Sequence, residues 1–227
     1  MATALLVALC AGFYSCGGDN DETPLNNDDN SNISNENGNS VIVGTTAMVQ
    51  LKKVGALSTL ISDNVKFNIT DLRIMGDING DDIALIREMA GADVKGNETN
   101  GKLANLNLSN ANLVNGGIYY TGITQEVSSS NELWQYMFYK CGSLTSIVLP
   151  NNIAHIGAFA LSYSGITSFT IPNNIQTIGN EAFANCTKLE SIVIGNSIVS
   201  AAENMLDGCI YNHRTTKTNQ KYPSVNL

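Results

Sequence analysis

A period of 22 or 23 residues is the feature that most restricts what this chain can fold into. Leu144, Ile166 and Leu189 occupy one position of the repeat, and a further unit begins at Met205. A fixed period in this range is typical of solenoids, in which each unit buries its apolar face only against its neighbours. Residues 131–209 are therefore predicted to form three complete stacked units and the start of a fourth.

The sequence of each unit predicts one short strand that has a buried side and an outward side. In the first unit Ile147 and Leu149 alternate with Ser146 and Val148, and the Pro-Asn-Asn turn at 150–152 ends the strand. The equivalent outward positions are the only regularly repeated surface that faces one direction, so they are the predicted binding ladder. This ladder consists of Ser146, Val148, Ser168, Thr170, Ser191 and Val193.

Aromatic residues are predicted to close the far side of each unit. Phe138, Phe159 and Phe183 align as these plugs. In this alignment Ser162 stands where the neighbouring units have Cys, and one residue is inserted before Ile166. The middle unit is thus expected to depart slightly from the other two.

The repeated cysteines are predicted to form a buried column. Cys141, Cys186 and Cys209 share one repeat position, and Cys is a favourable small buried residue. We expect free thiols; a Cys186–Cys209 disulfide stays an alternative, because adjacent units approach disulfide distance. A zinc site is not expected, since neither His155 nor His213 lies at ligand spacing to a Cys pair.

The repeat also resembles a known family. Residues 178–186, Ile-Gly-Asn-Glu-Ala-Phe-Ala-Asn-Cys, match nearly residue for residue the I-G-x-x-A-F-x-x-C motif of BspA-type leucine-rich repeats. This resemblance implies an α/β-type leucine-rich-repeat solenoid of short strands. Because such repeats occur on surface proteins of gut and oral anaerobes, it also implies a surface protein. The spacing of the motif is strong evidence for the fold and weak evidence for the identity of a ligand.

Residues 46–130 lack the repeat and predict a β-α-β region. Residues 69–74 and 103–108 alternate like strands, and a helix over 83–90 is expected between them, capped by Asp82. This order resembles the region that precedes the repeats in BspA-type surface proteins. We therefore expect an N-terminal cap domain over the open end of the solenoid. The predicted junction residues are Leu133 and Trp134.

Residues 1–15 predict a lipoprotein signal peptide. The apolar run at 4–11 is too short to span a bilayer, and Phe-Tyr-Ser-Cys at 13–16 resembles the lipobox of bacterial lipoproteins. The resemblance implies acylation of Cys16, with Cys10 a weaker match, and a lipid-anchored position at the outer membrane and cell surface. No Lys or Arg precedes the run, unlike the usual pattern. The alternatives are an ordinary cleaved signal and a hydrophobic N-terminus with an incidental Cys.

The two ends of the chain are predicted to be disordered. Residues 16–45 are expected to form an acidic tether, because six acids and no bases fall within 17–40 and apolar groups are scarce. Residues 210–227 are expected to form a tail that does not pair as a strand, because polar Asn212 stands where the repeat needs an apolar residue. The last unit would then leave an open strand edge, which predicts weak self-association.

Charge and residue content exclude several functional classes. The net charge of −8 argues against nucleic acid, and outside the tether the acids and bases nearly balance, at 14 against 12. The sequence has two His, no Ser/His/Asp or Cys/His arrangement and no glycine-rich phosphate loop. We therefore predict no catalytic residues and no cofactor.

One segment has a partial calcium-binding pattern. Asp77, Asn79, Asp81 and Glu88 fall at positions 1, 3, 5 and 12 of such a loop. The sixth position requires glycine, and here it is Asp82. A turn at residues 79–80 that leads into a helix explains the segment better, so no metal site is predicted.

The favoured function is adhesion or binding to an extracellular or host protein. A glycan-capture lipoprotein that serves nutrient uptake and a structural envelope protein are the alternatives. Sugar sites generally place aromatic rings on an exposed face, and the predicted ladder contains none. The ladder therefore favours a protein ligand.

Overall fold

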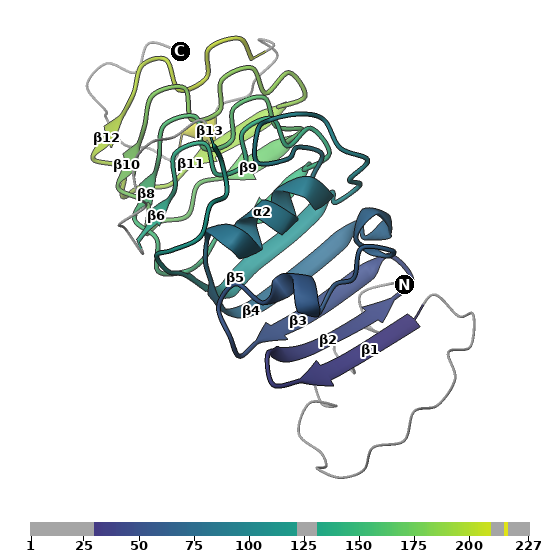
Figure 1. The fold of residues 1–227 in the computed structure, drawn as a ribbon. Coiled ribbons are helices and arrows are strands. Elements are labelled where there is room, and N and C mark those ends of the chain that lie inside the picture. Colours follow the sequence, from purple (N-terminus) through teal and green to yellow (C-terminus); the bar gives the residue numbers. More distant parts are fainter. Residues whose placement is uncertain (1–29, 122–130, 210–215, 218–227) are drawn as a thin grey trace.

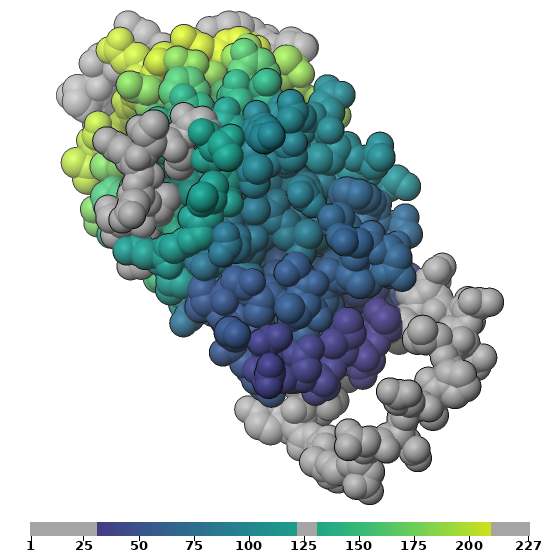
Figure 2. All heavy atoms as spheres, viewed as in Figure 1, coloured from purple at the N-terminus to yellow at the C-terminus, as the bar shows by residue number. Residues whose placement is uncertain are grey.

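The computed structural model describes residues 30–121, 131–209 and 216–217. Cys16, the predicted signal peptide and most of the predicted tail lie outside these residues. The described chain is elongated, and its order in sequence runs along the long axis (Figures 1 and 2). Among the described residues, no helix combines the length and the apolar character needed to cross a membrane.

A six-stranded sheet joins the N-terminal region to the first repeat (Figure 1). The first three strands are antiparallel, and each later strand pairs in parallel with the one before it. In sheet order the strands are β1 (Asn30–Asn35), β2 (Gly38–Val43), β3 (Thr46–Leu51), β4 (Asp71–Ile78), β5 (Asn105–Leu113) and β7 (Ser146–Val148). The predicted strands at 69–74 and 103–108 are thus confirmed as β4 and β5.

The prediction of disorder up to residue 45 is wrong for residues 30–43, which form the β1–β2 hairpin. Its strands are polar, but Ile42 is buried, and the buried hydroxyl of Ser40 donates a hydrogen bond of 2.7 Å to the carbonyl of Leu60. Gly38 sits against the backbone carbonyl of Gln50, where a side chain has no room. The average composition of the segment predicted disorder, whereas Gly38, Ser40 and Ile42 supply the contacts that hold the hairpin in place.

Helix α2 (Gly80–Met89) lies over β4 and β5 and completes the predicted β-α-β order (Figure 1). Its N-cap is Asn79, whereas Asp82 was predicted. The two residues form a capping box: the Asn79 side chain accepts from the Asp82 amide, and the Asp82 carboxylate accepts from the Asn79 amide. Two short 3₁₀ helices, η2 (Leu57–Thr59) and η3 (Lys66–Asn68), precede β4.

The repeats stack as two further parallel ladders, which is a leucine-rich-repeat type of fold. Equivalent strands follow one another at the spacing of the sequence period, so Thr177 pairs with both His155 and Ser200. One ladder contains β6 (Glu132–Leu133), β8 (His155–Ile156), β10 (Thr177–Ile178) and β12 (Ser200–Ala201). The other contains β9 (Ser168–Thr170), β11 (Ser191–Ile194) and β13 (Thr216–Lys217).

Strand β13 corrects the prediction for the tail. Thr216 and Lys217 pair in parallel with Val193 and Ile194. The backbone thus keeps the 23-residue spacing between β11 and β13, although Thr216 and Lys217 are polar. Strand β11 is therefore covered by β13 and is not an open edge. Self-association through the last unit stays a prediction, but an open edge at β11 no longer supports it.

A third ladder is made by the turns on the far side of the units. The amide of Tyr136 donates to the carbonyl of Ala158, and the amide of Phe159 donates to that of Asn180. These bonds make Phe159 equivalent to Tyr136, so the alignment of Phe159 with Phe138 is wrong. Leu161, which is fully buried, takes the plug position in the middle unit.

The cysteine column is present, with Ser164 in place of the predicted Ser162. The Ser164 hydroxyl lies 3.4 Å from the Cys186 sulfur. Cys141, Cys186 and Cys209 are free and buried, as predicted. The middle unit is one residue shorter after Ser164, and Gly165 allows this because it packs directly on the carbonyl of Gly142.

These thiols are expected to be inert in the folded protein. Burial raises the pKa of Cys141 and Cys186 to about 11, so both stay protonated at neutral pH. Burial also raises the pKa of Cys209. In a Cys10→Ala, Cys16→Ala chain at pH 8, Ellman's reagent should therefore label none of the three remaining thiols until denaturant is added. Rapid labelling of the native chain would show that the column opens.

A buried arginine side chain connects α2 to the first repeat. The Arg87 guanidinium donates to the carbonyls of Tyr136, Met137 and Asp93 at 3.0–3.1 Å, and it lies 5.1 Å from the ring centre of Tyr120. No motif or period in the sequence marked Arg87 as a junction residue. The predicted junction residues, Leu133 and Trp134, are also buried there.

Candidate functional site

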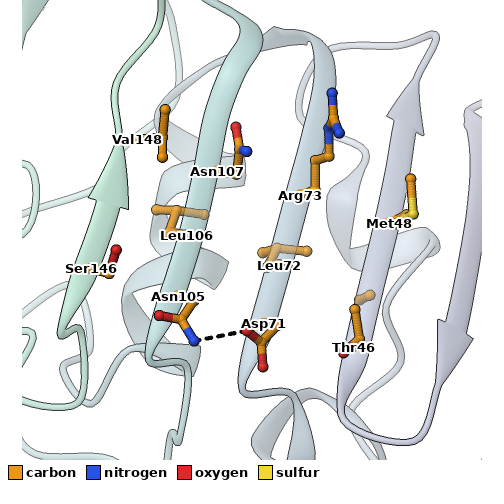
Figure 3. A pocket seen from close by; sticks show the side chains of 11 residues that line it. Thr46, Met48, Asp71, Leu72, Arg73, Asn105, Leu106, Asn107, Ser146 and Val148 are labelled. Carbon is orange, nitrogen blue, oxygen red and sulfur yellow. Dashed lines mark hydrogen bonds between the residues drawn. The ribbon is translucent and has the colours of Figure 1, made fainter. Parts of the chain in front are cut away.

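The outward side chains of the strands form two continuous rows across the sheet. Backbone register aligns Thr46, Asp71, Asn105 and Ser146, and in parallel it aligns the residues two positions further along each strand. Figure 3 shows both rows on the face opposite α2. We call this surface the outward strand face. Its residues in β3, β4, β5 and β7 are Thr46, Met48, Asp71, Arg73, Asn105, Asn107, Ser146 and Val148.

The predicted ladder continues these rows. Ser168 pairs with Ser191, and Thr170 pairs with Val193. The amide of Thr167 donates to the carbonyl of Thr145, which brings β9 alongside β7. Four of the six predicted residues are exposed, and Ser191 and Val193 are half-buried. The structure therefore brings the predicted residues together on one face.

A groove of about 220 Å³ crosses this face over β3, β4, β5 and β7. Ser146 and Val148 form one wall, so the first unit of the predicted ladder borders the groove (Figure 3). Met48 contributes to the lining and is only 4% exposed, whereas Val148 is 48% exposed. The groove thus has an apolar part beside polar amide and hydroxyl groups.

Arg73 is the cationic group of the groove, which is also lined by the carboxylate of Asp71. Its side chain is half-buried, and its Nε has no hydrogen-bond partner within the described residues. Within the described residues Asp71 and Arg73 form no ion pair, and the Asp71 carboxylate accepts from the Asn105 amide and the Thr70 hydroxyl, each at 2.7 Å. A guanidinium placed in this way can bind a carboxylate through two parallel hydrogen bonds.

The part of the face that lies before the repeats was missed by sequence reasoning. Met48, Arg73 and Asn107 belong to non-repeating strands, so periodicity could not reveal them. The alternation in β4 was a usable signal, because Leu72 and Ile74 are buried on either side of Arg73. The pairing of β5 with β7 joins this region to the ladder, and no local pattern in the sequence of either strand predicts it.

The residues of the calcium-like pattern have separate partners. Asp77 accepts from Asn112, Asp81 accepts from the Ile118 amide, and Glu88 binds Lys66. Across residues 30–121, 131–209 and 216–217, no group of His, Cys, Asp and Glu side chains is arranged to hold a metal ion. The favoured interpretation of a turn leading into a helix therefore describes the segment, with Asn79 as its cap.

Comparisons with known proteins identify the repeats. The family model for the BspA type leucine-rich repeat region matches residues 121–223 in six copies. This match begins before and ends after the segment 131–209 that was predicted from the visible period. No curated protein sequence matches the chain.

Among solved structures, a leucine-rich cell surface protein from Faecalibacterium prausnitzii A2-165 is similar to this chain. The two are 14% identical with a TM-score of 0.31, and the alignment covers 81% of this chain and 58% of that one. This chain therefore spans somewhat more than half the length of that protein.

Proposed function

Because residues 121–223 belong to the BspA-type leucine-rich repeat family, we propose that this chain is a non-catalytic cell-surface protein that binds another protein. Its partner is an extracellular or host protein, and adhesion is the biological outcome. The repeats form a short solenoid, and the region 46–130 acts as its N-terminal cap. The lipobox resemblance supports anchoring at the outer membrane through acylated Cys16.

The observation that carries this proposal is the continuity of the outward strand face. Twelve side chains from β3 to β11 lie in two aligned rows, and the groove with Arg73 interrupts them near one end. Amide, hydroxyl and apolar groups in such a mixture suit a protein surface, and Arg is enriched among residues that dominate binding energy. We therefore assign the Arg73 groove to an acidic side chain of the partner.

Placing Lys at Ser146, Ser168 and Ser191 together is expected to abolish protein binding. Three long cations would crowd one row of the face and would meet unpaired in the complex. Binding of the full chain and the variant is measured on an array of extracellular-matrix and serum proteins. Circular dichroism should show an unchanged fold, because Ser146 and Ser168 are exposed and Ser191 is half-buried.

The matched control places Lys at Ser58, Ser197 and Ser200, which are exposed and lie outside the outward strand face. It adds the same charge and should keep binding. Arg73→Ala should weaken binding by about tenfold or more while leaving the fold intact. Normal binding by the Lys variant of the outward strand face would exclude this surface.

A further inference from the structure

Several bulky residues occupy a backbone conformation that suits glycine and asparagine better. Tyr136, Phe159 and Tyr163 have φ values of 59°, 56° and 58°. In this left-handed region the Cβ atom crowds the backbone, which makes large side chains rare there. Backbone strain of this kind in a folded protein raises the question of what the side chain contributes.

The repeat itself shows that aromatic residues are not required at these positions. The turn position of Tyr136 and Phe159 is occupied by Glu181 in the next unit, with φ 52°. The position of Tyr163 is occupied by Asn185 and then by Gly208, with φ 57° and 72°. The first unit has Lys140 in the column of Tyr163, with φ 62°. Rings therefore occupy the turn at Tyr136, Phe159 and Tyr163, whereas the units on either side of Tyr163 use other residues at its position.

These rings form a row along the stack. Tyr120 and Tyr136 are stacked with ring centres 5.1 Å apart, and Tyr136 and Phe159 are stacked at 4.8 Å with ring planes within 1°. The Arg87 guanidinium lies over the ring of Tyr120, 5.1 Å from the ring centre. The row of stacked rings therefore runs from Tyr120, which lies beside Arg87, to Phe159.

Beyond Phe159 the side chains in these columns become polar. We call the place where the rings of Phe159 and Tyr163 give way to Glu181 and Asn185 the aromatic step. Glu181 follows Phe159 and Asn185 follows Tyr163 in their columns. Phe159 is half-buried, and Tyr163 is 49% exposed. The ring of Tyr163 meets that of Tyr139 edge-on, at 5.7 Å between ring centres. Within the described residues the Glu181 carboxylate has no hydrogen-bond or ion-pair partner.

Polar groups that donate and accept hydrogen bonds surround the step. Burial, with smaller contributions from Tyr120 and Glu181, raises the pKa of Tyr136 and Tyr139, so their hydroxyls stay available as donors. Glu181 supplies carboxylate acceptors, and Asn185 supplies an amide. Flat rings beside such groups match a ligand with apolar C–H faces and hydroxyl edges.

From this arrangement we infer that the step formed by Phe159, Tyr163, Glu181 and Asn185 is a binding site for a neutral polysaccharide. A pyranose ring lies on the exposed ring of Tyr163, and its hydroxyls bond to Glu181 and Asn185. The carboxylate disfavours acidic sugars, which selects a neutral chain. This site is separate from the outward strand face and uses no residue of it.

Tyr163→Asn tests this site, because it installs the residue that the next unit uses at the same turn. The fold should be kept or strengthened, since Asn accepts a positive φ more readily than Tyr. Affinity for the polysaccharide should fall by about tenfold or more. Native gel electrophoresis of the full chain measures this in gels that contain hydroxyethyl cellulose, yeast mannan or glycol chitin.

Tyr163→Phe is the matched control, because it keeps the ring, and it should be retarded in the gel like the unchanged chain. Retardation of the unchanged chain that Tyr163→Asn abolishes supports the site. Three results would overturn it: no retardation by any of the polymers, equal retardation of Tyr163→Asn, or binding that tetramethylammonium chloride removes. The last result would identify the rings as a cation site.

Discussion

Arg87→Met is expected to lower the free energy of unfolding by about 3 to 5 kcal/mol. The guanidinium is fully buried and donates to three backbone carbonyls, of Tyr136, Met137 and Asp93. Methionine keeps much of the apolar stem but leaves these carbonyls buried without donors. Urea unfolding followed by circular dichroism and by the fluorescence of Trp134, the only tryptophan, measures the loss.

Arg73→Met is the matched control, since Arg73 is half-buried and makes no hydrogen bond or ion pair within the described residues. It should change the unfolding free energy by less than about 1 kcal/mol. Arg87→Lys should fall between the two, because an ammonium keeps the charge but cannot reproduce the planar fork. Similar losses for Arg87→Met and Arg73→Met would show that the three carbonyl bonds are not what holds the junction.

Cys16→Ala is expected to move the protein from the membrane fraction to the soluble fraction. Acyl chains on Cys16 would contribute about 0.8 kcal/mol for each buried CH₂ group, and several chains together anchor a protein stably. The chain is expressed in a bacterium that processes lipoproteins and labelled with radioactive palmitate. Label and membrane association should disappear together.

Cys10→Ala serves as the comparison, because Cys10 lies within the apolar run and matches the lipobox less well. It should retain both label and membrane association. If Cys16→Ala stayed in the outer membrane at the level of the unchanged chain, the lipid anchor would have to be abandoned. Loss of the anchor in Cys10→Ala alone would instead move the acylated residue to position 10.

Periodicity predicted the repeats well, because the spacing of their strands is a property of the sequence itself. Thr177 pairs with His155 and Ser200 at the intervals that the apolar residues already displayed. The alignment of the turns was wrong at Phe159, because apolar character was matched while backbone conformation decides the position. Phe159 is equivalent to Tyr136 through their shared positive φ, which the sequence does not display.

The candidate site could be predicted only in part for a related reason. Ser146, Ser168 and Ser191 were found because they repeat, whereas Arg73 lies in a strand that occurs once. Its place on the same face depends on the pairing of β5 with β7, which joins residues far apart in the chain. Long-range pairing of this kind follows from the whole fold. The aromatic step was likewise hidden, because Phe159 was assigned to the core and Tyr163 was given no role.

The pairing of β5 with β7 also bears on how the protein reaches its folded state. The N-terminal region offers a preformed strand edge to the first repeat, and each completed unit then offers the same edge to the next. Units that contact only their neighbours can fold by nucleation at one end and growth from it. Growth in this direction follows the order in which a chain is synthesised, N-terminus first. Each unit can therefore pack on the folded unit before it as soon as it is synthesised, before the residues that follow it in the chain have been made.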